Sequence, residues 1–348
     1  MLLYVVRRLA WAAVLLVAVT LNAYVLFYVV PTDDAALGAS FANVSVDSGV
    51  NRFEVEGSVL TGYVHYLGQL VHGDLGQSWR THEDVTAIVG RALPATGSLV
   101  LGGAVLWISF ALVIGVVSAM RPRSLFDRAG MIFVLIGIAA QPLWLGYVLA
   151  YVFGGRLHWF PIAGYCDFVR PQEGVSCGGP VQWTYHLVLP WFTFALAFAA
   201  MYARMLRANL LETTNEEYVR TARAKGLSEW GTVRSHTFRN AVIPIVAMVG
   251  MDIGLAFAGA LFVERAFRIP GVGMLTIMSL QSRDLPVLLG IVVTVSVVIV
   301  VCNLVADLVL GVLDPRIGGG MFRFRRPERP TRAPAVPEGS WVATSSRN

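Results

Sequence analysis

The chain has 348 residues, of which 56% are hydrophobic and only 14% are charged, and its formal net charge is +5. A soluble domain cannot bury so large an apolar share, so this composition excludes a soluble globular protein and indicates an integral membrane protein. The basic residues have no interleaved aromatic pattern, which argues against nucleic acid as a partner and leaves the lipid bilayer as the expected surroundings.

Six apolar stretches are long enough to cross about 30 Å of hydrocarbon as helices. We therefore predict an all-α fold with six transmembrane helices. The first stretch follows Arg7 and Arg8, as a signal peptide would, but its apolar core is longer than that of a typical signal, so we expect a retained helix. The stretches are Leu9–Val30, Ser98–Ala119, Ala129–Gly155, Leu187–Ala203, Ala241–Val263 and Leu285–Gly311.

The distribution of basic residues predicts the orientation of these helices. Six spans place both termini on one side, and that side carries 19 of the 27 lysines and arginines. The other side carries eight basic residues, and its first segment also carries eight acids. The positive-inside rule then predicts that both termini lie on the cytoplasmic side of the cell membrane.

The segment 31–95, after the first span, is the longest one expected outside the membrane. Apolar residues at Val59, Tyr63, Tyr66, Leu67 and Leu70 predict a short amphipathic helix. The stretch HGDLGQS (72–78) then introduces two glycines and predicts a turn. We expect a second helix from about Asp84 to Arg91, capped by Thr81 with Asp84, or by His82.

The third apolar stretch and the segment after it contain two further signals. Gln141 with Pro142 predicts a kink within the third span. Cys166 and Cys177 lie in the next segment, on the side expected to be oxidising, where they can form a disulfide or remain as two free thiols. No cluster of histidines and cysteines with metal-ligand spacing lies nearby, so we expect no metal.

A mixed-charge segment separates the fourth and fifth stretches, with nine charged residues between Glu212 and Arg239. Thr214 and Glu217 have the spacing of a capping box for a short helix from about Glu216 to Lys225. Gly226 stands where a helix C-cap glycine is expected, and Ser228 can cap a second short helix through about His236. On its residues alone, this segment is either a docking elbow or an ordinary solvated loop.

The segment EEYVRTARAKGL…HTFRNAVIP resembles the cytoplasmic EAA-type loop of ABC importer permeases. RRLAWAAVLLVAVTLNAYVLFYVVPTD, HGDLGQS, ERAFRIPGVGML, RDLPVLLG and NLVADLVLGVLDPRI are similar to further motifs of one subfamily. This subfamily is the B-type permease subunit of the dipeptide, oligopeptide and nickel importers, and the resemblance covers roughly residues 1–317. Where the generic loop has Glu-Ala-Ala before its glycine, this chain has Arg220, Thr221 and Ala222, a form that is common in the peptide subfamily.

The resemblance implies a type I ABC importer permease core with cytoplasmic coupling helices and an extracytoplasmic segment after the first helix. It implies four partners, namely a second permease subunit of C-type, two cytoplasmic ATP-binding subunits and an extracytoplasmic substrate-binding protein. The chain has no phosphate-binding GxxxxGK[ST] motif, so we expect neither ATPase activity nor a cofactor. The residues implied to couple to the ATPase are Glu217, Tyr218, Arg220, Thr221, Ala222, Arg223, Lys225 and Gly226.

Asp252 lies midway along the fifth stretch, where a carboxylate is costly. It either lines the translocation pathway together with Gln141 or pairs with a polar group of the partner permease. We expect Asp307, toward the end of the sixth stretch, to pair with Arg204 or Arg207. The glycines at 102, 103, 250, 254 and 259 predict close packing of helices.

The external motifs allow two interpretations. They shape the external gate or the contact with the binding protein, or they form purely local turns. The residues concerned are His72, Gly73, Asp74 and Gly76 of HGDLGQS, with Pro270 and Gly271 of ERAFRIPGVGML.

The chain divides into an N-terminal part with the first span (1–30), the external segment (31–95), the permease core (96–312) with its coupling loop (212–240), and a cytoplasmic tail (313–348) expected to be unfolded. The predicted function is the permease subunit of an ATP-driven peptide importer. The alternatives are a secondary transporter or channel subunit, and an importer of nickel chelates or another non-peptide cargo. A membrane-embedded enzyme would need a catalytic constellation at membrane depth, and the sequence has none.

Overall fold

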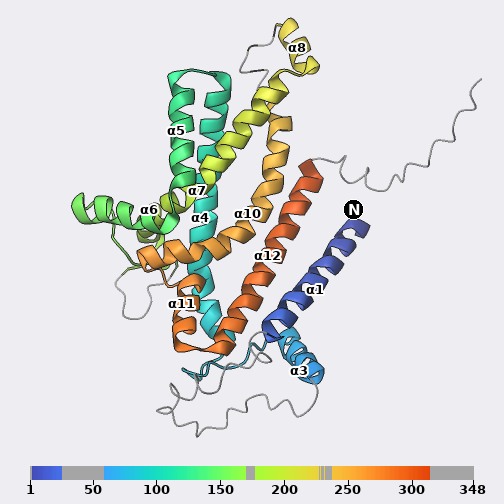
Figure 1. The fold of residues 1–348 in the computed structure, drawn as a ribbon, viewed down its shortest axis with the longest axis vertical. Helices are drawn as coiled ribbons and strands as arrows, with labels where there is room; N and C mark the ends of the chain where they lie inside the picture. The colour runs from blue at the N-terminus through green and yellow to red at the C-terminus, as the bar shows by residue number, and fades with distance from the viewer. Residues whose placement is uncertain are drawn as a thin grey trace, which may run out of the picture.

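The computed structural model describes residues 2–25, 59–169, 177–226 and 237–313, together with residues 228 and 231. Every regular element in these ranges is a helix, and Figure 1 shows the helices as a tilted bundle. The elements are α1 (Leu2–Tyr24), α3 (Val59–Val71), α4 (Val85–Met120), α5 (Leu125–Ala139), α6 (Pro142–Leu149), the π-helix η2 (Ala150–Arg156), α7 (Pro180–Thr214), α8 (Glu217–Ala224), α10 (Phe238–Phe267), α11 (Val272–Ser282) and α12 (Leu285–Leu313).

Four predicted spans are confirmed as single helices that are long and apolar enough to cross a membrane. These helices are α4, α7, α10 and α12, and they contain the predicted second, fourth, fifth and sixth stretches. The first stretch corresponds to α1, whose described apolar part is shorter, and residues 26–30 of that prediction lie outside the described ranges. The amphipathic helix expected around Tyr63 is confirmed as α3.

The third stretch was predicted to be one kinked span, but the bend is much sharper than a kink. The chain breaks between α5 and α6, and the two helical parts meet at 109°. Pro142 cannot donate a backbone hydrogen bond and occupies the first position of α6. Gln141 caps that new helix, because its side-chain Oε1 accepts from the N–H of Trp144 at 3.3 Å. Figure 1 accordingly shows α6 lying across the direction of α5.

A separate helix from Asp84 to Arg91 was also a wrong prediction. These residues form the start of α4, which continues through Pro94 to Met120. Neither predicted cap is used: Asp84 occupies the N-cap position without a side-chain hydrogen bond, and His82 has a positive φ of 56°. The segment before α4 is organised instead by Ser78, as described below.

The main apolar core lies between α4 and α7 and extends to α10. Trp107 of α4 is fully buried and stacks on Phe198 at 4.7 Å between ring centroids. A Cβ atom at Gly102 would lie 2.1 Å from the Trp191 ring, and one at Gly250 would lie 1.9 Å from the Ala306 side chain. Close packing is confirmed at these two glycines, and also at 103 and 254. It was wrong at 259, where a Cβ would meet nothing within 4 Å.

Both ends of the bundle are distinct in Figure 1. The start of α1, the connection from α4 to α5, the short helix α8 and the end of α12 lie toward one end. The helix α3, the segment 72–84 and the turn from α11 to α12 lie toward the other. This arrangement separates α8 from the HGDLGQS segment by most of the length of the bundle.

Candidate functional site

The mixed-charge segment forms an elbow at the end of α7. The helix α7 ends at Thr214, and α8 runs from Glu217 to Ala224, one residue shorter at each end than predicted. Val219 is 0% exposed and Ala222 is 6% exposed, three positions apart on one face of α8. The buried face fixes α8 against the rest of the chain, and the opposite face stays open.

The predicted capping box at this elbow was wrong. The Thr214 hydroxyl donates to the carbonyl of Leu210 at 2.6 Å, so Thr214 is the last residue of α7 and does not cap α8. The carbonyl of Glu216 instead accepts from the N–H groups of Val219 and Arg220 at 3.1 and 3.2 Å. Thr214 is part of the last turn of α7 and its hydroxyl donates backward, so its side chain does not cap the next helix.

Gly226 ends the elbow in the left-handed conformation that the sequence predicted, with φ of +86°. A Cβ at this position would meet nothing within 4 Å, so backbone conformation rather than space favours glycine. Ser228 accepts from the N–H of Gly231 at 3.2 Å, the spacing of an N-cap. The rest of the second short helix lies outside the described residues.

The open face of α8 carries most of the residues implied to couple to the ATPase. Ala222 belongs instead to the buried face, and the side chain of Arg223 lies outside the described part. The exposed residues of this set are Glu217, Tyr218, Arg220, Thr221, Lys225 and Gly226. One acidic and two basic side chains beside the Tyr218 ring give an oriented contact surface.

A buried ion pair lies seven residues before the end of α7. The Arg207 guanidinium donates to both carboxylate oxygens of Asp127 on α5, from Nε at 2.7 Å and from Nη2 at 2.8 Å. Asp127 is 5% exposed and also accepts from the backbone N–H of Arg123 at 2.9 Å. The prediction of Asp307 as the partner of Arg207 was therefore wrong, and this pair joins α7 to the start of α5.

Asp252 has a hydrogen-bond partner within the chain. The hydroxyl of Tyr202 on α7 donates to Asp252 Oδ2 at 2.5 Å, and Asp252 is half-buried. Tyr202 itself is 1% exposed and packs beside Trp107. The structure brings Asp252 to α7, whereas Gln141 has its role at the cap of α6.

The HGDLGQS segment forms the turn after α3. Gly73 and Gly76 have φ of +79° and +81°, which favours glycine at both positions. Asp74 Oδ1 accepts from the N–H of Gly76 at 2.8 Å, while His72 and Asp74 are exposed. Ser78 then turns inward and donates to Asp284 Oδ2 at 2.5 Å, which joins this segment to the start of α12.

The ERAFRIPGVGML segment is organised by Glu264, which is 0% exposed. Its Oε1 accepts from the Thr96 hydroxyl at 2.5 Å, and its Oε2 accepts from the N–H of Met274 at 2.9 Å. The Thr96 hydroxyl in turn accepts from the N–H of Val272 at 2.7 Å. Glu264 and Thr96 thereby satisfy two free N–H groups at the start of α11 and join it to α4 and α10.

Two glycines of the same segment make room for that carboxylate. A Cβ at Gly271 would lie 2.2 Å from Glu264 Oε1, and one at Gly273 would lie 2.9 Å from Glu264 Oε2 and 2.5 Å from the Cα of Leu261. Pro270 precedes them at the surface. The predicted pair Pro270 and Gly271 therefore stands at the joint between α10 and α11.

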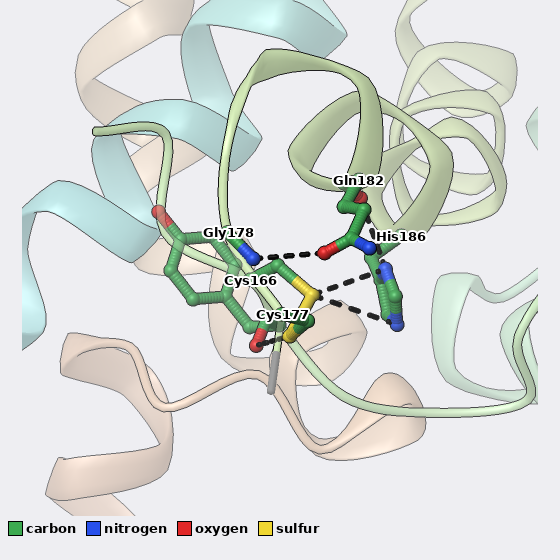
Figure 2. The surroundings of a disulfide bond; sticks show 6 residues. Cys166, Cys177, Gly178, Gln182 and His186 are labelled. Atoms are coloured by element: carbon green, nitrogen blue, oxygen red, sulfur yellow. Dashed lines mark hydrogen bonds between the residues drawn. A yellow bond between two sulfur atoms is a disulfide. The ribbon is translucent and has the colours of Figure 1, made fainter. Parts of the chain in front are cut away.

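Cys166 and Cys177 are joined by a disulfide, with an S–S distance of 2.15 Å and a Cα–Cα distance of 5.5 Å. Figure 2 shows the bond beside the first turns of α7, where His186 Nδ1 lies 3.3 Å from the sulfur of Cys166. The N–H of Gly178 donates to the side chain of Gln182 at 2.8 Å. The disulfide loop is thus fastened to the N-terminal end of α7.

Sequence reasoning missed Asp127 and five further residues of these sites. The signal for Glu264 and Asp284 was present, because each is an acid directly at the boundary of an apolar stretch. Thr96 and Ser78 gave no such signal, since a hydroxyl is common in any segment. Tyr202 gave no signal either, because it is one of several aromatic residues in a predicted span.

Comparison with known proteins identifies the family to which this chain belongs. Residues 111–319 match the family described as "Binding-protein-dependent transport system inner membrane component". Residues 1–100 match its N-terminal companion, "Binding-prot-dependent transport system membrane comp, N-term". Both the elbow and the ERAFRIPGVGML segment fall within the first match.

Relatives match nearly their whole length. A permease protein of Brucella suis is 34% identical over 322 residues, covering 91% of this chain and 99% of the relative. The "Di/tripeptide transport system permease protein DppB" of Pseudomonas aeruginosa is 32% identical over 332 residues, covering 91% and 99%. A peptide ABC transporter permease protein of Sinorhizobium fredii is 30% identical over 321 residues, covering 90% and 98%. The chain is therefore a multi-pass membrane permease that belongs to the family of binding-protein-dependent transport system inner membrane components.

Proposed function

We propose that this chain is the B-type permease subunit of an ATP-driven importer and forms half of its translocation pathway. The observation that carries the proposal is the α8 elbow. Its Val219 and Ala222 face is buried, its charged face is open, and Gly226 ends it in the left-handed conformation. Such an element is anchored on one side and can receive a partner on the other.

The proposed partners follow from the family description and from the lack of a phosphate-binding motif in the sequence. A second permease subunit completes the pathway, and two cytoplasmic ATP-binding subunits supply the hydrolysis that this chain has no phosphate-binding motif to perform. An extracytoplasmic binding protein delivers the cargo, in keeping with the family description. The positive-inside rule supports an orientation with both termini and α8 in the cytoplasm.

Peptides are the proposed cargo. The relatives from Pseudomonas aeruginosa and Sinorhizobium fredii are named for di/tripeptide and peptide transport. A peptide has a cationic amino terminus, and Asp252 offers a carboxylate at mid-span that is only half-buried. The carboxylate is held from one side by the Tyr202 hydroxyl, which leaves its other oxygen for a ligand.

Replacement of Gly226 by valine tests the elbow. We expect peptide uptake to fall about tenfold, because a β-branched residue strongly disfavours a φ of +86° and reorients the open face of α8. Gly226→Asn is the matched control, since asparagine tolerates the left-handed region. The measurement is uptake by proteoliposomes together with ATP hydrolysis, and equal uptake by the valine variant and the wild type would contradict the coupling role.

Replacement of Asp252 by asparagine tests the pathway. We expect uptake of peptides with a free amino terminus to fall several-fold, while uptake of N-acetylated peptides changes little, because asparagine keeps the shape but loses the charge. Tyr202→Phe is the control that removes the hydrogen bond and keeps the carboxylate. If Asp252→Asn transports both kinds of peptide as the wild type does, Asp252 has no role in recognising the amine.

A further inference from the structure

The helices α6 and η2 follow each other without a break over Pro142–Arg156, and one face of this α6–η2 segment is packed inside the molecule. Small buried residues recur on that face at every fourth position, namely Gly146, Ala150 and Gly154. A Cβ at Gly146 would lie 2.9 Å from the Cβ of Ala266, in the last turn of α10. Arg265 and Arg268 beside this turn are exposed, so the turn lies at the edge of the membrane and not in its interior.

The opposite face of the α6–η2 segment is aromatic and open. Trp144, Tyr147 and Tyr151 are 62%, 50% and 58% exposed, and their spacing of three and four residues places them on one side of the helix. A tryptophan or tyrosine ring combines an apolar body with one polar atom, so such rings gather where hydrocarbon meets water. The open face therefore has the composition of a membrane interface.

The length of α5 gives the depth of the segment. The 15 residues of α5 correspond to about 22 Å, which leaves about 8 Å of a hydrocarbon layer of roughly 30 Å. A helix that lies in the interface has its apolar face buried about 5–10 Å into the boundary between headgroups and acyl chains. At this depth the chain turns by 109°, so the α6–η2 segment runs across the direction of α5 and does not complete the crossing (Figure 1).

The end of the segment carries a cation that suits a lipid phosphate. Arg156 Nε donates to the hydroxyl of Tyr151 at 2.9 Å, and the guanidinium carbon lies 5.6 Å from the centre of the Tyr151 ring. Both residues are exposed, and among the residues that the structure describes Arg156 forms no ion pair with an acid. A guanidinium has five N–H groups, so those not bonded to Tyr151 are open to a phosphate, which accepts two parallel hydrogen bonds.

We propose that the α6–η2 segment is an interfacial helix that binds the bilayer surface on the side of the last turn of α10. Its aromatic face lies among the acyl chains next to the headgroups, and Arg156 binds a lipid phosphate. The large exposed residues in the second half of α5 lead into this face and are purely aliphatic, which favours lipid over a second permease subunit as the occupant. These residues are Ile132, Leu135, Ile136 and Ile138.

The test measures the depth of single spin labels in the assembled transporter in nanodiscs, with Cys302→Ser as the background because Cys166 and Cys177 are paired. Labels at Trp144→Cys and Tyr151→Cys lie seven positions apart, about 10 Å along the helix. Their collision rates with oxygen and with a polar nickel chelate report depth. We expect the two depths to differ by about 3 Å, because the segment is nearly perpendicular to α5.

A matched pair of positions on α5 is the control for this measurement. Leu125→Cys and Ile132→Cys are also exposed and seven positions apart, and their depths should differ by about 10 Å. A difference of about 10 Å between positions 144 and 151 would show that the segment crosses the membrane and would overturn the inference. So would equal depths with few oxygen collisions at both positions, since a protein partner would then cover the face.

A charge reversal tests the phosphate contact. A label at Leu157→Cys, next to the end of η2 and exposed, should move several Å toward water when Arg156→Glu is added, because a carboxylate is repelled by phosphate. Tyr151→Phe is the control, since it removes the hydrogen bond to Arg156 and keeps the positive charge, and it should leave the label depth unchanged. An unchanged depth in the Arg156→Glu variant would contradict the binding of a headgroup by Arg156.

Discussion

Replacing Glu264 with alanine is expected to lower the free energy of unfolding of the assembled transporter by about 3 kcal/mol, because it leaves two buried groups without their acceptor. These groups are the hydroxyl of Thr96 and the N–H of Met274, both of which donate a hydrogen bond to the Glu264 carboxylate. The loss also removes the link between α10 and the first turn of α11. Thermal unfolding of the purified complex measures the effect.

The neighbouring residues provide controls for this prediction. Arg265→Ala should be close to neutral, because Arg265 is exposed one position along the same helix. Glu264→Gln should fall between, since the amide keeps one acceptor and replaces the other with a donor. Hydrogen exchange should increase within Val272–Ser282 in the alanine variant. An alanine variant with wild-type unfolding and wild-type exchange in α11 would show that Glu264 does not hold this helix.

Replacing Arg207 with alanine should cost about 2–3 kcal/mol, somewhat less than for a fully buried pair, because a quarter of the Arg207 side chain is exposed. The reason is that Asp127, with 7% of its side chain exposed, would keep its charge without a cation. Arg207→Lys should recover only part of the loss, since an ammonium cannot reproduce the two parallel hydrogen bonds.

A double variant distinguishes the pair from its separate members. When Asp127 and Arg207 are both replaced by leucine, much of the stability should return, because no buried charge is left unpaired. Unfolding of the purified transporter with each single variant and the double variant completes the cycle. A double variant less stable than both single variants would indicate that the two residues do not act as a pair.

Apolar run length was sufficient to predict most of the bundle. The stretches that became α4, α7, α10 and α12 are long and continuous, so lipid thickness and backbone hydrogen bonding leave a helix as the outcome. The third stretch was misjudged because hydropathy does not report direction. Composition continues smoothly through Gln141 and Pro142, while the proline and its glutamine cap turn the chain by 109°.

The elbow was predicted well where a single residue decides the conformation, and poorly where one hydroxyl can either donate backward or accept from the next helix. Gly226 could be placed from sequence because glycine has little reason to follow a charged helical turn except as its terminator. The role of Thr214 could not, since a threonine hydroxyl can bond backward to its own helix or forward to the next. The length of α7 decided between them, and that length depends on packing along α4.

The buried polar sites depended on contacts that no local pattern contains. Glu264 meets Thr96, and Asp284 meets Ser78, across sequence separations of about 170 and 200 residues. A single sequence identifies the acids as unusual but does not say which hydroxyl donates a hydrogen bond to each of them. The same holds for Arg207, for which the sequence suggested Asp307 and the fold brings Asp127 instead.

The helix α7 is longer than a membrane span requires, and it continues through Pro190. Its 35 residues correspond to about 52 Å, which exceeds the roughly 30 Å of hydrocarbon that it has to cross. One arm carries the elbow and the Arg207 ion pair, and the other carries the fastening of the disulfide loop. A tilt of roughly 5° about the middle of such a rod moves each tip by about 2 Å in opposite directions. In the proposed coupling, a push on α8 would be carried along this one helix toward the far side of the membrane, with Pro190 as the point at which the helix lacks a backbone hydrogen bond.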